Sequence, residues 1–409
     1  MSSCLTPSVR RENNDALPLL EPEVLAHGER VLVFLREQIA QAGGALDFAE
    51  FMRLALYAPD LGYYAAGMTK FGAAGDFVTA PEISPLFAQT LARQVAEVLT
   101  EVLAGLGQDA DVLEFGAGSG SLAMELLLAL EALQCLPRRY LILEVSASLR
   151  TVQRERLARL APHVLARVVW LEAWPQDFVG VMLGNEVLDA MPVRILEVTA
   201  GEPLRLAVSD SAQGLAWAKL PASEEDVRVL AELAAARGEA FAEGYRVEFH
   251  PDLPGWVCGV AQSLQRGVVL LLDYGAAAVE LYVQERWMGT LRCHVRHHAH
   301  NDPLIHPGLQ DITAWVDFSR LARCAKASGL DVLGYTMQAH FLLGCGLAAV
   351  YEDAFAHAER EVDRLQLAQG FKTLMMPGEM GERFKVMALG RGVEADLSGF
   401  GVRDFRGRL

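Results

Sequence analysis

A short apolar segment followed by closely spaced glycines constrains the fold of this chain more than any other feature. Residues 111–115 are expected to form a buried strand, and Gly116, Gly118 and Gly120 come directly before an apolar helical segment. Glycines allow the backbone to approach a ligand closely, and the first turn of the helix offers free N–H groups. A strand, a glycine-rich turn and a helix in this order are typical of a nucleotide site in a Rossmann-like sheet.

Two cofactors compete for such a loop. Residues 118–123 match the dinucleotide pattern G-x-G-x-x-G/A, so the glycines alone do not separate the two. Glu114 stands just before them, where its carboxylate would attract the sulfonium and ammonium groups of S-adenosylmethionine but repel a pyrophosphate. Glu144, at the end of the next expected strand, can hold the ribose hydroxyls of either cofactor. The loop therefore favours S-adenosylmethionine, and an NAD(P)-dependent oxidoreductase is the alternative.

The apolar periodicity around this loop alternates between strands and helices. Strands are expected over 111–115, 140–144, 164–171 and 178–183, and helices over 122–133 and 147–160. This alternation predicts an α/β fold, with a parallel Rossmann-like sheet covered by helices on both faces. Further expected helices precede the sheet over 21–41, 47–57 and 86–106. Alternating segments over 194–198, 204–208 and 215–219 then indicate an antiparallel insertion, followed by a helix over 224–240. A helix over 317–328 and strands over 267–273, 330–335 and 384–389 complete the prediction.

These patterns divide the chain into five parts. We expect a loose tail over 1–20, an N-terminal helical cap with a cofactor-lid loop over 21–106, and a Rossmann-like cofactor-binding core over 107–193. An inserted antiparallel β/helical subdomain follows over 194–266, and 267–409 supplies the remainder of the sheet with the substrate-side loops.

Composition narrows the class of protein. The chain has 52 acidic and 36 basic residues and a net charge of −16, without the basic stripe of a nucleic-acid binder. No apolar run reaches the ~18–20 residues that span a bilayer, and the N-terminus lacks the apolar segment of a secretion signal. The six cysteines form no C-x-x-C pair, which indicates a reducing compartment and argues against a zinc site. We expect a soluble cytoplasmic protein, with its oligomeric state open.

The end of the fourth expected strand carries the candidate catalytic residues. Ligands bind beyond the carboxyl ends of parallel strands, and Asn185, Glu186 and Asp189 follow residues 178–183 there. S-adenosylmethionine is a methyl donor. Methyl transfer depends on the positioning of the acceptor and on electrostatic stabilisation more than on acid–base catalysis. We expect Asn185 to hydrogen-bond at the reacting centre and Glu186 to orient the acceptor, with Asp189 on the same face of a short helix. The alternative is that Asn185 caps this helix and Asp189 only favours its first turn.

Several segments also match a known family, in the family's order. They are residues 62–64, 71–82, 113–120, 144–146, 185–193, 272–275, 289–292, 310–313 and 316–318. On these segments the chain resembles the MidA-like methyltransferases, whose mitochondrial members are assembly factors of respiratory complex I. It departs from the family at Ala80, where Ser is common, and at Trp315, and the last twenty residues carry no recognised motif.

The resemblance implies a class I methyltransferase fold, S-adenosylmethionine as the cofactor and methylation of a protein arginine. If arginine is the acceptor, carboxylates suit it because they bind the planar guanidinium through two hydrogen bonds. The resemblance does not identify the target protein. Two readings stay open besides the oxidoreductase: an assembly or scaffold partner that needs no catalysis, and a methyltransferase for a small molecule or RNA.

Two loops are open to more than one interpretation. The loop before residue 86 contains Asp76 and Glu82, and we expect it to cover the cofactor, with Asp76 near the methionine ammonium and Tyr63 or Phe77 shielding the site. Packing between the N-terminal helices is the other explanation for its aromatic residues. Residues 294–306 contain five histidines without metal-ligand spacing, so no metal is expected. We expect this loop to shape the substrate groove, together with Asp311 and Asp317, although Asp317 can equally cap a helix.

Overall fold

The computed structural model describes residues 18, 20–66, 79–105 and 109–409. Its larger unit is built on an eight-stranded sheet with the order β15-β16-β10-β5-β2-β3-β4, and β14 pairs with β10 beside this path. These strands are β2 (Asp111–Phe115), β3 (Tyr140–Leu143), β4 (Val168–Leu171), β5 (Phe178–Asn185), β10 (Leu264–Ala276), β14 (Val316–Asp317), β15 (Asp331–Met337) and β16 (Phe384–Arg391).

The order in which the strands are added to the sheet reverses between β2 and β5, which are parallel neighbours. From β2 the chain moves outward through β3 and β4, all parallel, and then returns to β5 on the other side of β2. The order of the strands makes the carboxyl ends of β2 and β5 a topological switch point, where open α/β sheets bind ligands. The predicted Rossmann-like α/β fold is confirmed, and β16 runs antiparallel to both of its neighbours.

Both faces of the sheet are buried under helices. Along β10, Val268, Leu270 and Leu272 belong to one apolar cluster, whereas Val269 and Leu271 belong to the other, as expected for a strand covered on both faces. The first cluster includes residues of α4 (Pro85–Glu97), α5 (Ser121–Ala132), α6 (Ala147–Leu160), α11 (Gln338–Gly344), α12 (Leu347–His357) and α13 (Glu361–Met375). The second includes α8 (Leu253–Ser263) and α10 (Phe318–Ala327).

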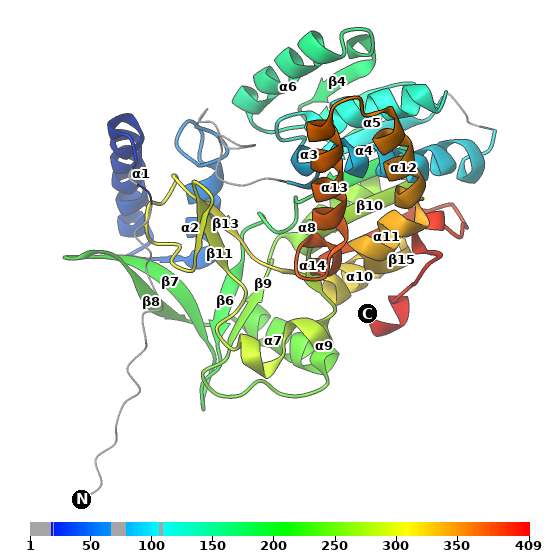
Figure 1. Cartoon of the computed structure of the whole chain (residues 1–409). Helices are drawn as coiled ribbons and strands as arrows, with labels where there is room; N and C mark the ends of the chain where they lie inside the picture. The colour runs from blue at the N-terminus through cyan, green and yellow to red at the C-terminus, as the bar shows by residue number, and fades with distance from the viewer. Residues whose placement is uncertain (1–17, 19, 67–78, 106–108) are drawn as a thin grey trace, which may run out of the picture.

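A smaller unit lies beside the carboxyl ends of the large sheet (Figure 1). It contains a five-stranded antiparallel sheet of β1 (Ala45–Asp47), β6 (Arg194–Glu197), β7 (Leu204–Ser211), β8 (Gly214–Pro221) and β9 (Arg246–Phe249). A three-stranded sheet of β11 (Arg292–Val295), β12 (His298–His300) and β13 (Asp311–Thr313) adjoins it. The antiparallel insertion is thus present. Its sheet also includes β1, which pairs with β7.

The N-terminal helices and the insertion share one apolar core. It contains residues of α1 (Pro22–Gln41) and α2 (Phe48–Tyr57), together with Val193, Ile195, Leu206 and Val208 from the insertion and Cys293 and Ile312 from the three-stranded sheet. Helices α1 and α2 of the N-terminal cap therefore belong to the smaller unit, because they bury their apolar faces against strands that come about 150 residues later, whereas α4 covers the large sheet.

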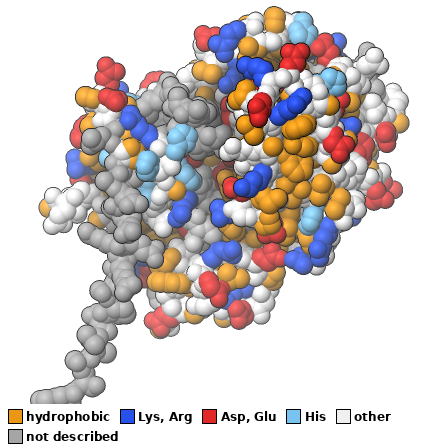
Figure 2. All heavy atoms as spheres, in the orientation of Figure 1, with side chains coloured by type: hydrophobic (Ala, Val, Ile, Leu, Met, Phe, Trp, Pro, Cys, Tyr) orange, Lys and Arg blue, Asp and Glu red, His pale blue; other side chains and the backbone are white. Residues whose placement is uncertain are grey.

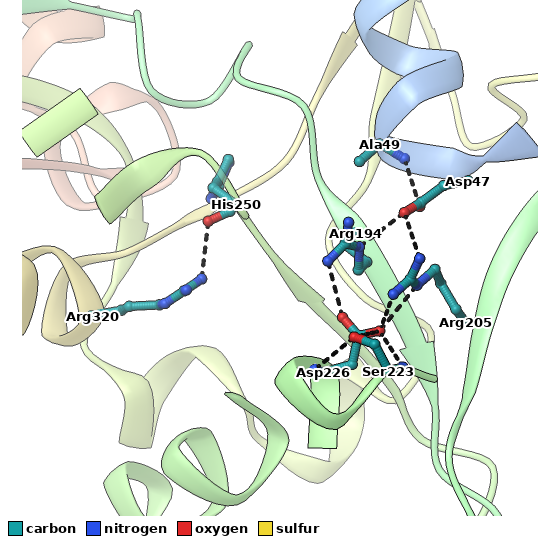
Figure 3. A network of polar contacts seen from close by, with 8 residues as sticks. All are labelled: Asp47, Ala49, Arg194, Arg205, Ser223, Asp226, His250 and Arg320. Carbon is teal, nitrogen blue, oxygen red and sulfur yellow. Dashed lines mark hydrogen bonds and ion pairs between the residues drawn. The ribbon is translucent and has the colours of Figure 1, made fainter. Parts of the chain in front are cut away.

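An ion-pair network joins the N-terminal cap to the insertion (Figure 3). Asp47 accepts a hydrogen bond from the backbone N–H of Ala49 at the start of α2, and its carboxylate pairs with Arg194 at 2.9 Å and Arg205 at 3.3 Å. Both arginines also contact Asp226 of α7 (Glu224–Arg237), with the Arg194 pair at 3.0 Å. The Asp226 side chain is fully buried, so the two guanidinium groups compensate its desolvation.

The surface agrees with the acidic but mixed composition. On the face shown in Figure 2, Lys and Arg side chains are interspersed with Asp and Glu side chains. Apolar side chains reach the surface on α13, where Val362 and Leu365 are exposed. Among the described helices, none is both long enough and apolar enough to cross a membrane.

Candidate active site

A cavity of 390 Å³ lies at the switch point of the large sheet. Its lining includes most of the site residues expected from the sequence, namely Glu82, Glu114, Gly116, Gly118, Glu144, Asn185, Glu186 and Asp189. Gly120 belongs to the same loop but does not line the cavity, and Asp76 and Phe77 fall outside the described residues. The smaller unit adds Tyr57, Tyr64, His294, Asp311 and Thr313 to the lining. The site is thus made by both units.

The glycine loop has the backbone conformation for which glycine is needed. The φ angles of Gly116, Gly118 and Gly120 are 58°, 52° and 79°, all in the left-handed region that other residues rarely adopt. A Cβ on Gly120 would lie 3.2 Å from the Cα of Gln153 in α6. Gly120 is also the N-cap of α5, so the loop directs the amino end of that helix toward the cavity.

Glu114 lies at the end of β2, as predicted, and is almost fully buried. Its Oε2 accepts a hydrogen bond of 2.7 Å from the Tyr140 hydroxyl. Burial raises its pKa to about 8, although the bond from Tyr140 opposes this shift. Because Glu114 lines the cavity without a basic partner among the described residues, a cation bound there would stabilise its ionised form.

Glu144 lies at the end of β3 and is held in place by two hydrogen bonds. Its Oε1 accepts from the backbone N–H of Ser146 at 2.9 Å, and its Oε2 accepts from the Gln153 side chain at 3.2 Å. The same Gln153 amide donates to the backbone oxygen of Gly118 at 3.0 Å. Gln153 therefore connects the glycine loop to Glu144. Sequence reasoning missed this residue, because a single glutamine in a polar helix carries no signal.

Glu82 connects the segment before α4 to the glycine loop. It lies in the short helix α3 (Ala80–Ile83), where its Oε1 accepts hydrogen bonds from the Ser119 hydroxyl and, at 3.2 Å, from Arg156. Tyr63, expected to shield the site, is instead buried in the core of the smaller unit, and its neighbour Tyr64 lines the cavity. That residues 67–78 cover the cofactor stays a prediction.

The expected helix after β5 is absent, and residues 186–191 form a turn. Glu186 has a φ of 53°, which is incompatible with an α-helix, so Asn185 does not cap one. The Glu186 carboxylate accepts hydrogen bonds from the backbone N–H of Ala80 at 3.3 Å and from the Asn185 side chain at 3.0 Å. This brings the end of β5 and α3 together over the cavity.

A second carboxylate from this turn and a third from the smaller unit complete the cluster. Asp189 is 4% exposed, and its Oδ1 has no hydrogen-bond partner among the described residues. Asp311 of β13 accepts a 2.8 Å hydrogen bond from the Tyr64 hydroxyl. Burial raises the pKa of Glu186 to about 8, and burial and the neighbouring carboxylates raise the pKa of Asp189 as well. Among the described residues, no Lys or Arg lines the cavity beside this cluster.

The charged side chains in the described lining of the cavity are all acidic. Six carboxyl groups line it, from Glu82, Glu114, Glu144, Glu186, Asp189 and Asp311, while its described lining contains no Lys or Arg. Glu82 pairs with Arg156 at 3.2 Å. A concentration of buried carboxylates is costly, which is typical of a site that binds positive charge. Aromatic side chains also line the cavity: Tyr57, Tyr64, Phe115, Trp174, Trp256 and Tyr274.

The histidine loop contributes one residue to this wall. His294 lines the cavity, and burial lowers its pKa to about 4, so it is neutral near pH 7. His297 and His298 are exposed near the turn between β11 and β12, and no metal-binding cluster occurs among the described residues.

Asp317 lies outside the lining of the cavity. It accepts a 2.9 Å hydrogen bond from the backbone N–H of Arg320 and so caps α10.

Comparisons with known proteins identify the class of this site. Residues 90–336 match the model of a family of S-adenosyl-L-methionine-dependent methyltransferases, Methyltransf_28. The chain belongs to this family. A solved structure of a COG1565 superfamily member from Burkholderia thailandensis, bound to S-adenosyl-homocysteine, is 43% identical with a TM-score of 0.88, over 96% of this chain and 100% of that one.

Curated relatives agree with this assignment. The mitochondrial protein arginine methyltransferase NDUFAF7 homolog of Drosophila melanogaster is 29% identical and covers 95% of this chain and 93% of its own length. The human protein arginine methyltransferase NDUFAF7 is 27% identical over 85% of this chain and 80% of its own length. The predicted MidA-like methyltransferase family and its cofactor are confirmed, and the dinucleotide alternative is not favoured.

The groups that line the cavity of this methyltransferase suit S-adenosylmethionine. The glycine loop leaves room for a ligand beside Gly116 and Gly118, Glu144 stands at the strand end that suits ribose hydroxyls, and Glu114 offers a buried carboxylate to a cationic group. That these residues hold the cofactor stays a prediction. When bound, S-adenosylmethionine supplies an electrophilic methyl group on a sulfonium centre.

Proposed function

We propose that this enzyme methylates a guanidinium nitrogen of an arginine side chain in a protein. The observation that carries the proposal is the carboxylate cluster of Glu186, Asp189 and Asp311, which lies in a cavity whose described lining lacks Lys and Arg. The cofactor accounts for one net positive charge, and Glu114 and Glu144 lie on its side of the cavity. Glu82 pairs with Arg156, and the remaining three carboxylates suit a second cation.

A guanidinium fits these carboxylates better than an ammonium does. Its planar fork donates parallel hydrogen bonds to carboxylate oxygens, and its flat face stacks on aromatic rings. Asp189 Oδ1 is available to accept such a bond, and Tyr57 and Tyr64 line the cavity as a stacked pair with ring centroids 5.4 Å apart. The names of the relatives as protein arginine methyltransferases support the same acceptor.

In the reaction, the carboxylates hold the guanidinium so that one nitrogen faces the methyl carbon. The nitrogen–carbon bond forms as the carbon–sulfur bond breaks, and the electron pair of the broken bond stays on sulfur. The methylated nitrogen then loses one proton, and Glu186 or Asp189 accepts it before it passes to solvent. Most of the rate enhancement comes from orientation and charge stabilisation.

We infer that this enzyme works in the cytoplasm. The six cysteines, which form no C-x-x-C pair, support a reducing compartment. The curated relatives, in contrast, are mitochondrial proteins. The family resemblance makes assembly of respiratory complex I the first process to examine.

Labelled S-adenosylmethionine tests the acceptor directly. The purified enzyme is incubated with cell extract and cofactor that carries a labelled methyl group, and the labelled protein is hydrolysed and analysed by mass spectrometry. We expect the label in methylarginine, and we expect Glu186→Gln to reduce transfer about tenfold or more, since a charged hydrogen-bond acceptor is lost. Glu225→Gln, at an exposed site on α7, is the matched control and retains activity.

The alternatives predict different outcomes. Label in another amino acid, or only in a small molecule, would overturn the arginine assignment. If the protein acts as a scaffold and catalysis is not essential, we expect Glu186→Gln to support the biological function as well as the unaltered chain does.

A further inference from the structure

The carboxylate of Asp273 lies beneath the turn that carries Glu186 and Asp189. It sits near the end of β10, next to β5 in the sheet, and is 1% exposed. Its Oδ2 accepts hydrogen bonds from three successive backbone N–H groups, those of Val187 at 3.2 Å, Leu188 at 2.8 Å and Asp189 at 3.2 Å. Its Oδ1 accepts the N–H of Tyr274 at 2.8 Å.

These bonds replace those that a helix or strand would supply. The left-handed conformation of Glu186 ends the pairing of β5 with β10, whose last bond runs from the Glu186 N–H to the Leu272 oxygen at 2.9 Å. The next three amides point inward, where a buried N–H without a partner is costly. Asp273 satisfies all three, so one side chain from a neighbouring strand sets the path of the turn.

Asp273 also contributes to the electrostatics of the cluster. Among the described residues it forms no ion pair with Lys or Arg. Burial raises its pKa to about 7, although the four backbone hydrogen bonds oppose this shift and favour its negative charge. After burial, this charge is the largest influence that raises the pKa values of Glu186 and Asp189. Asp273 therefore influences Glu186 and Asp189 in two ways: it fixes the turn that carries them, and its charge raises their pKa values.

We infer that Asp273 is a positioning residue for methyl transfer, which holds the Glu186–Asp189 turn in the geometry that receives the acceptor. The inference rests on the proposed role of these two carboxylates at the acceptor. It assigns Asp273 no contact with cofactor or substrate, and accordingly Asp273 does not line the cavity. Its loss slows transfer and leaves cofactor affinity nearly intact, because Glu114, Glu144 and the glycine loop hold the cofactor.

Hydrogen–deuterium exchange of the full chain tests the position of the turn without knowledge of the acceptor. Asp273→Asn keeps one neutral oxygen that can accept a hydrogen bond, whereas Asp273→Ala keeps none. We expect exchange at the amides of residues 187–189 to rise in the order unaltered chain, Asn, Ala, by about tenfold or more for Ala. The affinity for S-adenosyl-homocysteine, measured by calorimetry, changes less than about threefold, while methyl transfer to extract protein falls about tenfold or more.

Asp226→Asn is the matched control. Asp226 is also a buried carboxylate, and it accepts backbone and side-chain bonds from Ser223 (Figure 3). It belongs to the smaller unit and does not line the cavity. Its substitution lowers the unfolding temperature and leaves exchange at residues 187–189 unchanged. This separates a local effect on the turn from general destabilisation.

Two results would overturn the inference. One is unchanged exchange at residues 187–189 in Asp273→Ala, and the other is a rise in exchange across the whole large sheet. A local rise together with full transfer activity would also contradict the catalytic role of the turn. If the turn loosens as expected but Glu186→Gln transfers methyl groups normally, the turn is positioned by Asp273 and the proposed role of Glu186 is wrong.

Discussion

Glu114 shows how a single buried carboxyl group links the cofactor site to pH. Burial beneath Tyr140 raises its pKa to about 8, so in the ligand-free protein it is mostly protonated at pH 7. A cationic ligand favours the carboxylate and lowers that pKa. Cofactor binding near neutral pH is therefore coupled to release of a proton.

We predict that the affinity for S-adenosylmethionine rises between pH 6 and pH 8. A group that must lose its proton for binding weakens affinity by up to about tenfold per pH unit below its pKa, or about 1.4 kcal/mol. Titration calorimetry at pH 7 in two buffers of different ionisation enthalpy measures the proton release. Glu114→Gln should release fewer protons, and an identical heat in both buffers would contradict this account.

At the scale of elements, the glycine loop is well determined by its own sequence. Its strand, its three glycines and the following helix are local features, and all lie where periodicity and glycine spacing placed them. The turn after β5 was predicted wrongly as a helix. Its path depends on Asp273, more than eighty residues later, and no local pattern reveals such a long-range bond. Expectations based on neighbouring residues fail where a distant side chain supplies the hydrogen bonds.

Gly120→Ala tests the contribution of the loop. The left-handed conformation costs an alanine about 1–2 kcal/mol, and the new Cβ would crowd Gln153, which holds Glu144 and Gly118. We expect S-adenosylmethionine affinity to fall about tenfold or more, measured by calorimetry. Gly238→Ala, at the end of α7, is the control, because Gly238 has a φ of 91° and open space around it. Equal cofactor affinity in both variants would rule out a specific role of the loop.

At the scale of the molecule, the cavity is shared between two units. The large sheet supplies the residues expected from the sequence, because strand–helix alternation and strand ends can be read locally. The smaller unit supplies Tyr57, Tyr64 and Asp311, which come from distant parts of the chain. Their convergence depends on the pairing of β1 with β7 and of β11 with β13. Of Tyr57, Tyr64 and Asp311, only Asp311 was expected at the cavity from the sequence, which therefore predicted the lining from the large sheet better than the lining from the smaller unit.

The central claim is that the cavity recognises the positive charge of a guanidinium beside the cofactor. Calorimetry on the enzyme saturated with S-adenosyl-homocysteine tests it, with the labelled target segment synthesised once with arginine and once with citrulline, its neutral analogue of nearly the same shape. We predict that the citrulline peptide binds about tenfold or more weakly, because it removes the positive charge that the carboxylates of Glu186, Asp189 and Asp311 are proposed to bind. Equal affinity for the two peptides would contradict the claim.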